Sequence, residues 1–276
     1  MKLTFVMDNK TEDVRCNAEW GLSVLVESNG HKVLYDTGAS KMCLENYVNL
    51  EKDPKEIEAI VFSHGHSDHT EGTKAFTDAN KTAKLYIHKD GFFKSHGQDK
   101  NGDIETWWNC GIRWSDEYRE EIKDRLVLTE GIVKLNDNMT IVGNIKPAPG
   151  FKPTERFVKV VNGEYVVDTM SHEQFLAVEE GDTIHILSGC GHMGVVSTIL
   201  YAKELFPGKK IGSYTGGLHA YMLNEEKREE LAAKMKELGV EKVVPMHCTG
   251  MNMIITLKER LGENCIIKCA GDELEL

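Results

Sequence analysis

The hydrophobic pattern predicts different local structure in the first and last thirds of the chain. In the first third, short apolar runs are separated by turn residues, which predicts strands over residues 2–7, 22–28, 32–35, 59–62 and 84–88. Asn29 and Gly30 lie between two of these runs and are a strong signal for a tight hairpin. Short helices are predicted over residues 41–50 and 70–78.

The last third alternates apolar runs with amphipathic segments. This pattern predicts strands over residues 183–187, 210–214, 242–245 and 264–269, and helices over residues 193–205, 225–238 and 251–261. Further strands are predicted between the two thirds, over residues 125–128, 139–142, 157–161 and 174–179. Strands in both halves with helices between them predict an α/β (α+β) protein, in which two packed sheets carry outer helices and residues 1–276 form a single domain.

Residues 91–125 form an aromatic-rich insertion that interrupts this pattern. They contain Trp107, Trp108 and Trp114 among glycine, asparagine, aspartate and lysine residues. Two interpretations stay open. The segment is a lid, in which Trp107 and Trp108 line a substrate pocket and stack on a flat ligand, or the tryptophans pack the insertion onto the body or a partner subunit.

Composition narrows the classes of protein to which the chain can belong. With 276 residues, 41% of them hydrophobic, the chain can bury a sizeable core. A net charge of -11 without a Lys/Arg run argues against a nucleic-acid partner, and no stretch has the apolar length of a membrane span. Seven scattered cysteines without a C-x-x-C pair favour a reducing, cytoplasmic location. The oligomeric state stays open.

A cluster of potential metal ligands directly follows the apolar run at residues 59–62. It places His64, His66, Asp68 and His69 within six positions, in the pattern H-x-H-x-D-H. Imidazole and carboxylate are ligands that zinc prefers. Alternate positions of an extended segment point the same way, so His64 and His66 can share one metal ion. Asp68 and His69 follow a turn, where they can hold a second ion.

Later histidines follow predicted strands and can complete such a site. A two-metal site needs about six protein ligands, and the first cluster supplies only part of this number. His192 and His247, each near a glycine and just past an apolar run, are the predicted additional ligands. His172 and His219 stay open between a functional and a structural role. Cys190 is either a soft metal ligand or a small core residue, and the second is favoured because cysteine is among the most buried residue types.

Three of these features together resemble the metallo-β-lactamase superfamily along most of the chain. They are the motif from His64 to His69, the segment Tyr35-Asp36-Thr37-Gly38, and His247 after a late strand. The resemblance implies an αββα sandwich with two metals at one edge, between the sheets. Residues 189–192, 217–219 and 245–250 more narrowly resemble a subgroup of metal-dependent hydrolases, some of which are known as dihydropterin-ribofuranosylaminobenzene phosphate synthases.

The chain departs from the superfamily at one important position. Many members carry Gly-Asp after the strand that corresponds to residues 183–187, and that aspartate bridges the metals. Here the pair is Gly189-Cys190. Members also place a histidine about twenty residues before the aspartate, so the resemblance implies either His172 or His192 as the third ligand of the first metal. The missing bridge leaves occupancy of the second site open.

These features predict a metal-dependent hydrolase with two divalent metal ions. Zinc is the default, with iron and manganese as alternatives. A metal-activated hydroxide is expected to attack an ester, lactone, thioester or phosphoester of a small molecule. Asp68 is expected to orient the nucleophile, and His219 to donate a proton or contact the oxyanion. The alternatives are pterin-type phosphate synthase chemistry, an iron-dependent redox protein, and a non-catalytic ligand sensor.

Overall fold

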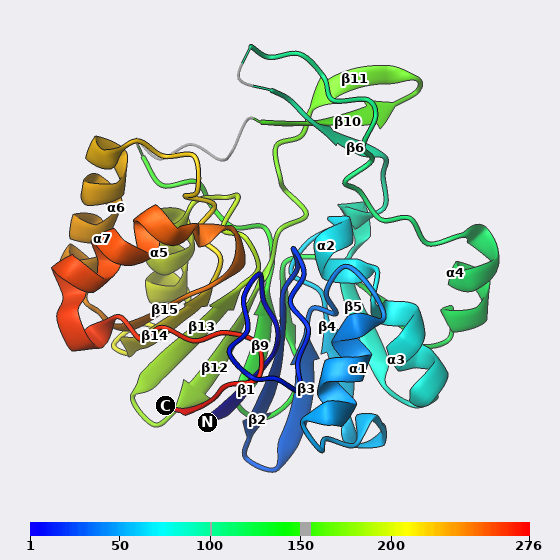
Figure 1. The fold of residues 1–276 in the computed structure, drawn as a ribbon, viewed down its shortest axis with the longest axis horizontal. Helices are drawn as coiled ribbons and strands as arrows, with labels where there is room; N and C mark the ends of the chain where they lie inside the picture. The colour runs from blue at the N-terminus through cyan, green and yellow to red at the C-terminus, as the bar shows by residue number, and fades with distance from the viewer. Residues whose placement is uncertain (100, 150–155) are drawn as a thin grey trace.

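Two mixed β-sheets pack face to face, with helices on both outer faces (Figure 1). The computed structural model describes residues 1–99, 101–149 and 156–276. The first sheet is seven-stranded, in the order β16 (Glu273–Glu275), β1 (Lys2–Met7), β2 (Ser23–Ser28), β3 (His31–Tyr35), β4 (Ala59–Val61), β5 (Lys84–His88) and β7 (Leu126–Thr129). The second is six-stranded, in the order β15 (Val240–Pro245), β14 (Lys210–Gly216), β13 (Thr183–Ser188), β12 (Phe175–Glu180), β9 (Met139–Val142) and β8 (Ile132–Lys134).

The helices form the two outer layers. Helices α1 (Met42–Asn49), α3 (Thr73–Ala79) and α4 (Asp116–Ile122) cover the first sheet, and α5 (Val195–Leu205), α6 (Glu225–Glu237) and α7 (Met251–Leu261) cover the second (Figure 1). No helix among the described residues is both long and apolar enough to cross a lipid bilayer. The two packed sheets and their outer helices confirm the predicted sandwich.

The strands are apolar on both faces because each sheet is covered on both sides. In β2, Val24 and Val26 point into the cluster between the two sheets, whereas Leu25 points toward the outer helices. The central cluster joins both sheets, since it also contains Leu176 and Val178 of β12. Alternate residues of one strand thus stabilise two different layers, which holds the strand ends in fixed positions.

The carboxyl ends of several strands from both sheets meet at one edge of the sandwich. Strands β3, β4, β13, β14 and β15 run parallel within their sheets, and β1 shares the direction of β3 because β2 is antiparallel to both. The loops that leave these strands carry most of the chain's candidate ligands. In the loop after β4, a short helix, α2 (Ser67–Thr70), turns the chain back. This split replaces the single predicted helix over residues 70–78 by α2 and α3.

A small third sheet stands above this edge (Figure 1). It contains β6 (Ser95–Gly97), β10 (Phe157–Val161) and β11 (Glu164–Val167), and β6 comes from the aromatic insertion. The other end of the insertion behaves differently, because Trp114 and α4 pack against the outer face of the first sheet. The segment 91–125 is therefore divided between the upper sheet and the body.

One predicted strand is wrong. Residues 264–269 make only an isolated bridge, from Cys265 to Val243, and Ile267 is 51% exposed. The chain then crosses to the first sheet, where β16 pairs with β1. The apolar run correctly predicts that Cys265 is buried. A run this short does not distinguish a strand from an extended connection.

The insertion gives a test of this division. Trp114 contacts Phe62, with ring centroids 5.5 Å apart, and its Nε1 donates to the Thr70 carbonyl at 3.0 Å. Trp107 is 80% exposed. We expect Trp114→Ala to lower the free energy of unfolding by about 3 kcal/mol, and Trp107→Ala by about 0.5 kcal/mol or less. Denaturant titrations measure both, and equal losses would contradict the division.

Candidate metal centre

The loop after β4 bends at residues 63–65 and is extended at His66, directly before the chain turns. His66 has φ −93° and ψ 148°, and α2 begins at the next residue. Gly65 lies so close to another loop that a Cβ atom there would be 2.1 Å from the Gly91 carbonyl oxygen. The close packing of these loops explains why glycine separates the two histidines.

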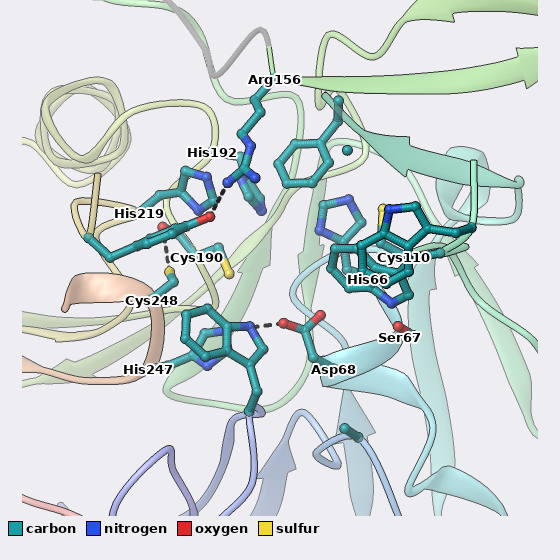
Figure 2. A pocket seen from close by; sticks show the side chains of 17 residues that line it. His66, Ser67, Asp68, Cys110, Arg156, Cys190, His192, His219, His247 and Cys248 are labelled. Atoms are coloured by element: carbon teal, nitrogen blue, oxygen red, sulfur yellow. Dashed lines mark hydrogen bonds and ion pairs between the residues drawn. The ribbon is translucent and has the colours of Figure 1, made fainter. Parts of the chain in front are cut away.

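The structure gathers the six predicted ligands into two adjacent groups. Ligand-competent atoms of His64, His66 and His192 lie within 4.8 Å of one another. The same holds for the second group, which contains Asp68, His69 and His247. Figure 2 shows His66 and Asp68 facing His192 and His247 across one cavity. Each group combines side chains from the β4 loop with a histidine of the second sheet.

Hydrogen bonds orient two of the imidazoles through one buried carboxylate. Ser63 donates its hydroxyl to Asp36 Oδ2 at 2.7 Å, so its oxygen can accept from His64 Nδ1 at 2.8 Å. His69 Nδ1 lies 2.7 Å from the same Asp36 oxygen. Protons on both Nδ1 atoms leave the Nε2 atoms of His64 and His69 to face the site, which is the tautomer that a metal ligand requires.

His247 is held in the same way by residues at the end of β1. Its Nδ1 donates to Asn9 Oδ1 at 2.9 Å, and its backbone N–H donates to Asp8 Oδ1 at 2.7 Å. Its Nε2 then points at Asp68 Oδ2, 3.3 Å away. His247 has a φ of 49°, which costs a non-glycine residue energy and is typical of functional positions.

Several ring nitrogens in these groups are buried without a partner. Within the described part of the chain, no hydrogen bond reaches His64 Nε2, His66 Nε2 or either ring nitrogen of His192. Buried polar atoms are normally satisfied, so such a concentration of exceptions is the pattern expected where a ligand from outside the chain binds. A divalent cation is the ligand that this set of nitrogen atoms fits.

The electrostatics favour neutral imidazoles in the first group. Burial lowers the pKa of His66 to about 3, and burial with neighbouring histidines holds the pKa values of His64 and His192 well below the usual range. Their lone pairs are therefore free at neutral pH. Burial opposes ionisation of Asp68, but His69 and His247 outweigh it and hold the Asp68 pKa below its usual range.

His69 differs from the first group. Burial lowers its pKa, but Asp36 and Asp68 have the larger combined effect and raise the pKa to about 9. Without a metal ion, His69 therefore carries a second proton at neutral pH, and a cation bound there must displace it.

His172 lies beside the first group but does not join it. Its Nδ1 accepts from the Gly65 N–H at 3.2 Å, so its Nε2 carries the proton and donates to Asp168 Oδ2 at 3.3 Å. Both ring nitrogens are thus used. Of the two candidates for the third ligand of the first metal, the structure places His192 with the group, and His172 supports the loop that carries His64 and His66.

Cys190 and His219 also face the site. Cys190 is buried, as expected for a core residue, yet its Sγ lies 3.2 Å from His69 Nε2. His219 lies 4.4 Å from His192 between ring centroids. It follows β14 with a φ of 47°.

His66 and His192 of the first group, and Asp68 and His247 of the second, line a cavity of about 450 Å³. Aromatic side chains form much of its lining, and Trp107 and Trp108 are among them. Trp108 is half-buried and also packs against the core of the second sheet. Arg156 brings a cation to the rim, where its Nη1 donates to the Tyr221 hydroxyl and its Nη2 lies 3.9 Å from Glu105. The other aromatic lining residues are Trp20, Phe157 and Tyr221.

Sequence reasoning missed the residues that support the ligands. Asp36 lies in the segment 35–38 that resembles the superfamily, but its role depends on the pairing of β3 with β4. This pairing places its carboxylate beside Ser63 and His69. No sequence pattern indicated a role for Glu173. Its buried carboxylate accepts hydrogen bonds from the backbone N–H groups of His192 and Met193 at 2.8 and 2.6 Å. Burial raises the pKa of Glu173 to about 7, although these two N–H donors oppose the rise.

Comparisons with known proteins agree with this arrangement. A protein from Methanocaldococcus jannaschii, named 7,8-dihydropterin-6-methyl-4-(beta-D-ribofuranosyl)-aminobenzene-5'-phosphate synthase, is 30% identical over 243 residues, covering 84% of this chain and 82% of that protein. The crystal structure of a metal-dependent hydrolase of the beta-lactamase superfamily matches with 26% identity and a TM-score of 0.82, covering 100% of this chain and 99% of that one.

A more distant structure shares the fold. Zinc-bound PqqB from Methylobacterium extorquens has 10% identity and a TM-score of 0.56, with 100% of both chains covered. The sequence profile of the Metallo-beta-lactamase superfamily matches residues 21–247, which include the β4 loop and the candidate ligands of the second sheet. The chain therefore belongs to the metallo-beta-lactamase superfamily.

Proposed function

We propose that the protein is a metal-dependent hydrolase of a small ester, lactone, thioester or phosphoester. One observation carries the proposal: two adjacent groups of ligand-competent side chains each supply two residues to the wall of the same cavity. The similar crystal structure of a metal-dependent hydrolase, at 26% identity over the whole chain, supports it. Zinc is the metal that the histidine-rich ligand set suits best, with iron and manganese as alternatives.

The ligand assignment follows from the tautomers and the unpartnered nitrogens. His64, His66 and His192 would hold the first ion, and Asp68, His69 and His247 the second. Bound there, divalent ions polarise a carbonyl or phosphoryl oxygen and supply a nucleophile from water at neutral pH. Asp36 and Asn9 fix the ligand rings, so the site needs little rearrangement when it is loaded.

Two side chains are placed to act on the substrate. Asp68 stays ionised at neutral pH, so its carboxylate can accept a hydrogen bond from the attacking water and orient it. His219 lines the cavity beside the first group, with its Nδ1 buried and free of hydrogen bonds to the described residues. From there His219 would donate a proton to the leaving group or a hydrogen bond to the developing oxyanion.

The cavity favours a substrate with a flat ring. Aromatic side chains form much of its lining, and such walls recognise planar groups through stacking. The relative at 30% identity that is named as a dihydropterin-linked phosphate synthase favours a second candidate, pterin-type phosphate synthase chemistry at the same site. Assays of zinc-loaded protein on aryl phosphodiesters, lactones and thioesters, beside a dihydropterin with a leaving group on its 6-methyl carbon and a ribofuranosylaminobenzene 5'-phosphate as acceptor, separate the two. Turnover of none of the first three classes would reject the hydrolase.

We expect the pure protein to bind up to two equivalents of divalent metal. The double variant His64→Ala with His66→Ala should lose at least one equivalent, because it removes two of the three ligands of the first group. Elemental analysis after dialysis measures the loss. Full metal content in a folded double variant would rule out the first group as a metal site.

His192 and His172 form a matched pair for the third ligand. His192→Ala should lose one equivalent. His172→Ala should keep both equivalents, with affinity lowered about 10- to 100-fold, as is usual when a residue that supports a ligand is removed. Metal titrations against a chromophoric chelator distinguish these outcomes, and the reverse pattern would assign His172 as the ligand.

His219→Ala tests the proton donor. Turnover should fall by about 10²- to 10⁴-fold, the usual contribution of general acid-base catalysis. Metal content should stay the same as in the unchanged protein. If metal content falls together with turnover, His219 is a ligand and not a donor.

A further inference from the structure

Among the described residues that line the cavity, Arg156 is the one lysine or arginine. Figure 2 shows its side chain directed into the cavity. The chain as a whole carries a net charge of -11, so a cation at this point is not part of a general basic surface. The charge of Arg156 therefore gives one region of the cavity wall a local preference for anions.

Hydrogen bonds fix the position of the Arg156 guanidinium. The Gln98 backbone N–H donates to the Arg156 carbonyl at 2.8 Å, and Arg156 Nε donates to the Gln98 carbonyl at 2.9 Å. On the other side, Arg156 Nη1 donates to the Tyr221 hydroxyl. The guanidinium is thus held between the upper sheet and the loop after β14. A ligand that binds to it does not have to order this side chain first.

The positive charge of Arg156 is only partly balanced by the protein. Its ion-pair partner among the described residues is Glu105, whose Oε2 lies 3.9 Å from Nη2. This distance is too long for a hydrogen bond. Arg156 Nη2 therefore donates no hydrogen bond to the described part of the chain, and its N–H groups are available to an anionic ligand.

Tyr221 supplies a second donor beside Nη2. Its hydroxyl oxygen accepts from Arg156, and no described residue accepts the hydroxyl proton. Burial raises the pKa of Tyr221, although the charge and the hydrogen bond of Arg156 oppose the rise, so the phenol keeps its proton at neutral pH. Gly250 packs against the Tyr221 backbone, where a Cβ atom on the glycine would lie 2.7 Å from the Tyr221 Cα. A fixed guanidinium and a fixed phenol form a donor pair that suits an oxygen anion.

The donor pair lies one side-chain ring away from the first group of candidate ligands. The ring centroid of Tyr221 is 5.4 Å from that of His219, and the ring centroid of His219 is 4.4 Å from that of His192. Trp20 borders the same region, with its ring centroid 5.6 Å from that of Tyr221. A flat ring with a reacting group at one end and an anionic group at the other can cover this spacing.

We propose that Arg156 and Tyr221 form an anion-binding subsite, and that the substrate is a flat aromatic molecule with a carboxylate or phosphate group remote from the bond that is cleaved. The proposal rests on the proposed hydrolase and names its class of substrate. Arg156 Nη2 and the Tyr221 hydroxyl donate hydrogen bonds to the anionic oxygens, and the aromatic walls hold the ring. Neither residue takes part in bond cleavage, so both determine specificity through binding.

Calorimetric titration of the protein with three probes tests the subsite without an activity assay. Naphthoate and naphthylphosphonate carry an anion on a flat ring, and naphthamide is a neutral counterpart of naphthoate with a similar shape. At least one anion should bind about tenfold or more tightly than the amide, as expected for hydrogen bonds to a charged group. The tighter anion shows whether the subsite suits a carboxylate or a phosphate. Chelator-treated protein should show the same preference, because no metal ion belongs to the subsite.

Four variants assign the preference to individual side chains. Arg156→Gln should bind the anions no more tightly than the amide, whereas Arg156→Lys should keep part of the preference because it keeps the charge without the planar fork. Tyr221→Phe should lower the preference about threefold or more, since it removes one donor and leaves the ring. Lys159→Gln is the matched control, because this cation of β10 lies over the Phe93 ring, 5.5 Å from its centroid, and does not line the cavity. It should bind all three probes like the unchanged protein.

Several results would overturn the subsite. They are equal affinity for the amide and both anions, a preference that disappears after chelation, and an equal loss for all three probes in Arg156→Gln, which would mean that Arg156 only joins the upper sheet to the body. If Arg156→Gln does not fold, Arg156→Lys and Tyr221→Phe decide by the same comparison. Failure of the hydrolase is a separate result. An intact preference for anions without turnover of any ester, lactone, thioester or phosphoester would reject the hydrolase and support the subsite.

Discussion

The buried carboxylate of Asp36 connects the segments that build the site. It lies at the end of β3 and accepts from the Ser63 N–H and hydroxyl, both at 2.7 Å, and from His69 Nδ1. Hydrogen bonds to a charged acceptor contribute about 1.5–3 kcal/mol each, and breaking a buried charged pair costs about 3–5 kcal/mol. Removal of this carboxylate would therefore misalign His64 and His69 at once, although Asp36 itself faces neither the cavity nor a metal position.

The sandwich supplies the rigidity that this arrangement needs. His219 and His247 both leave parallel strands of the second sheet in a left-handed backbone conformation, which costs about 1–3 kcal/mol for each non-glycine residue. The covered strands on either side hold these loops against the strain. The glycines at the strand ends allow the two sheets to approach closely at this edge, so that side chains from both reach one cavity.

Local spacing and strand ends could be interpreted from the sequence, but contacts between distant segments could not. The cluster from His64 to His69 is visible because its ligands are neighbours in the chain, and His247 because it follows an apolar strand. Cys190 could not be assigned, since a core cysteine and a buried ligand have the same sequence environment. Asp36 and Glu173 act through partners far away in the chain, and only the paired sheets show those partners.

The aromatic insertion shows the same limit. Trp107, Trp108 and Trp114 lie within a stretch of eight residues, and the sequence alone does not assign them different roles. The structure separates them because β6 pairs with β10 above the sandwich, whereas α4 returns to the first sheet. Tertiary pairing, which leaves no local mark in the sequence, decides which tryptophan faces the cavity.

The origin of the ligands has a consequence for how the fold withstands unfolding. Each proposed ion takes ligands from the loop after β4, in the first sheet, and from a loop after β13 or β15, in the second. A bound ion is therefore a cross-link between the two sheets, and it closes a loop of more than a hundred residues. Cross-links that close long loops stabilise chiefly by restricting the unfolded chain. A loaded protein would thus be clamped at this edge, and after loss of its ions the two sheets would be held together there by side-chain packing and by hydrogen bonds such as those from His247 to Asp8 and Asn9.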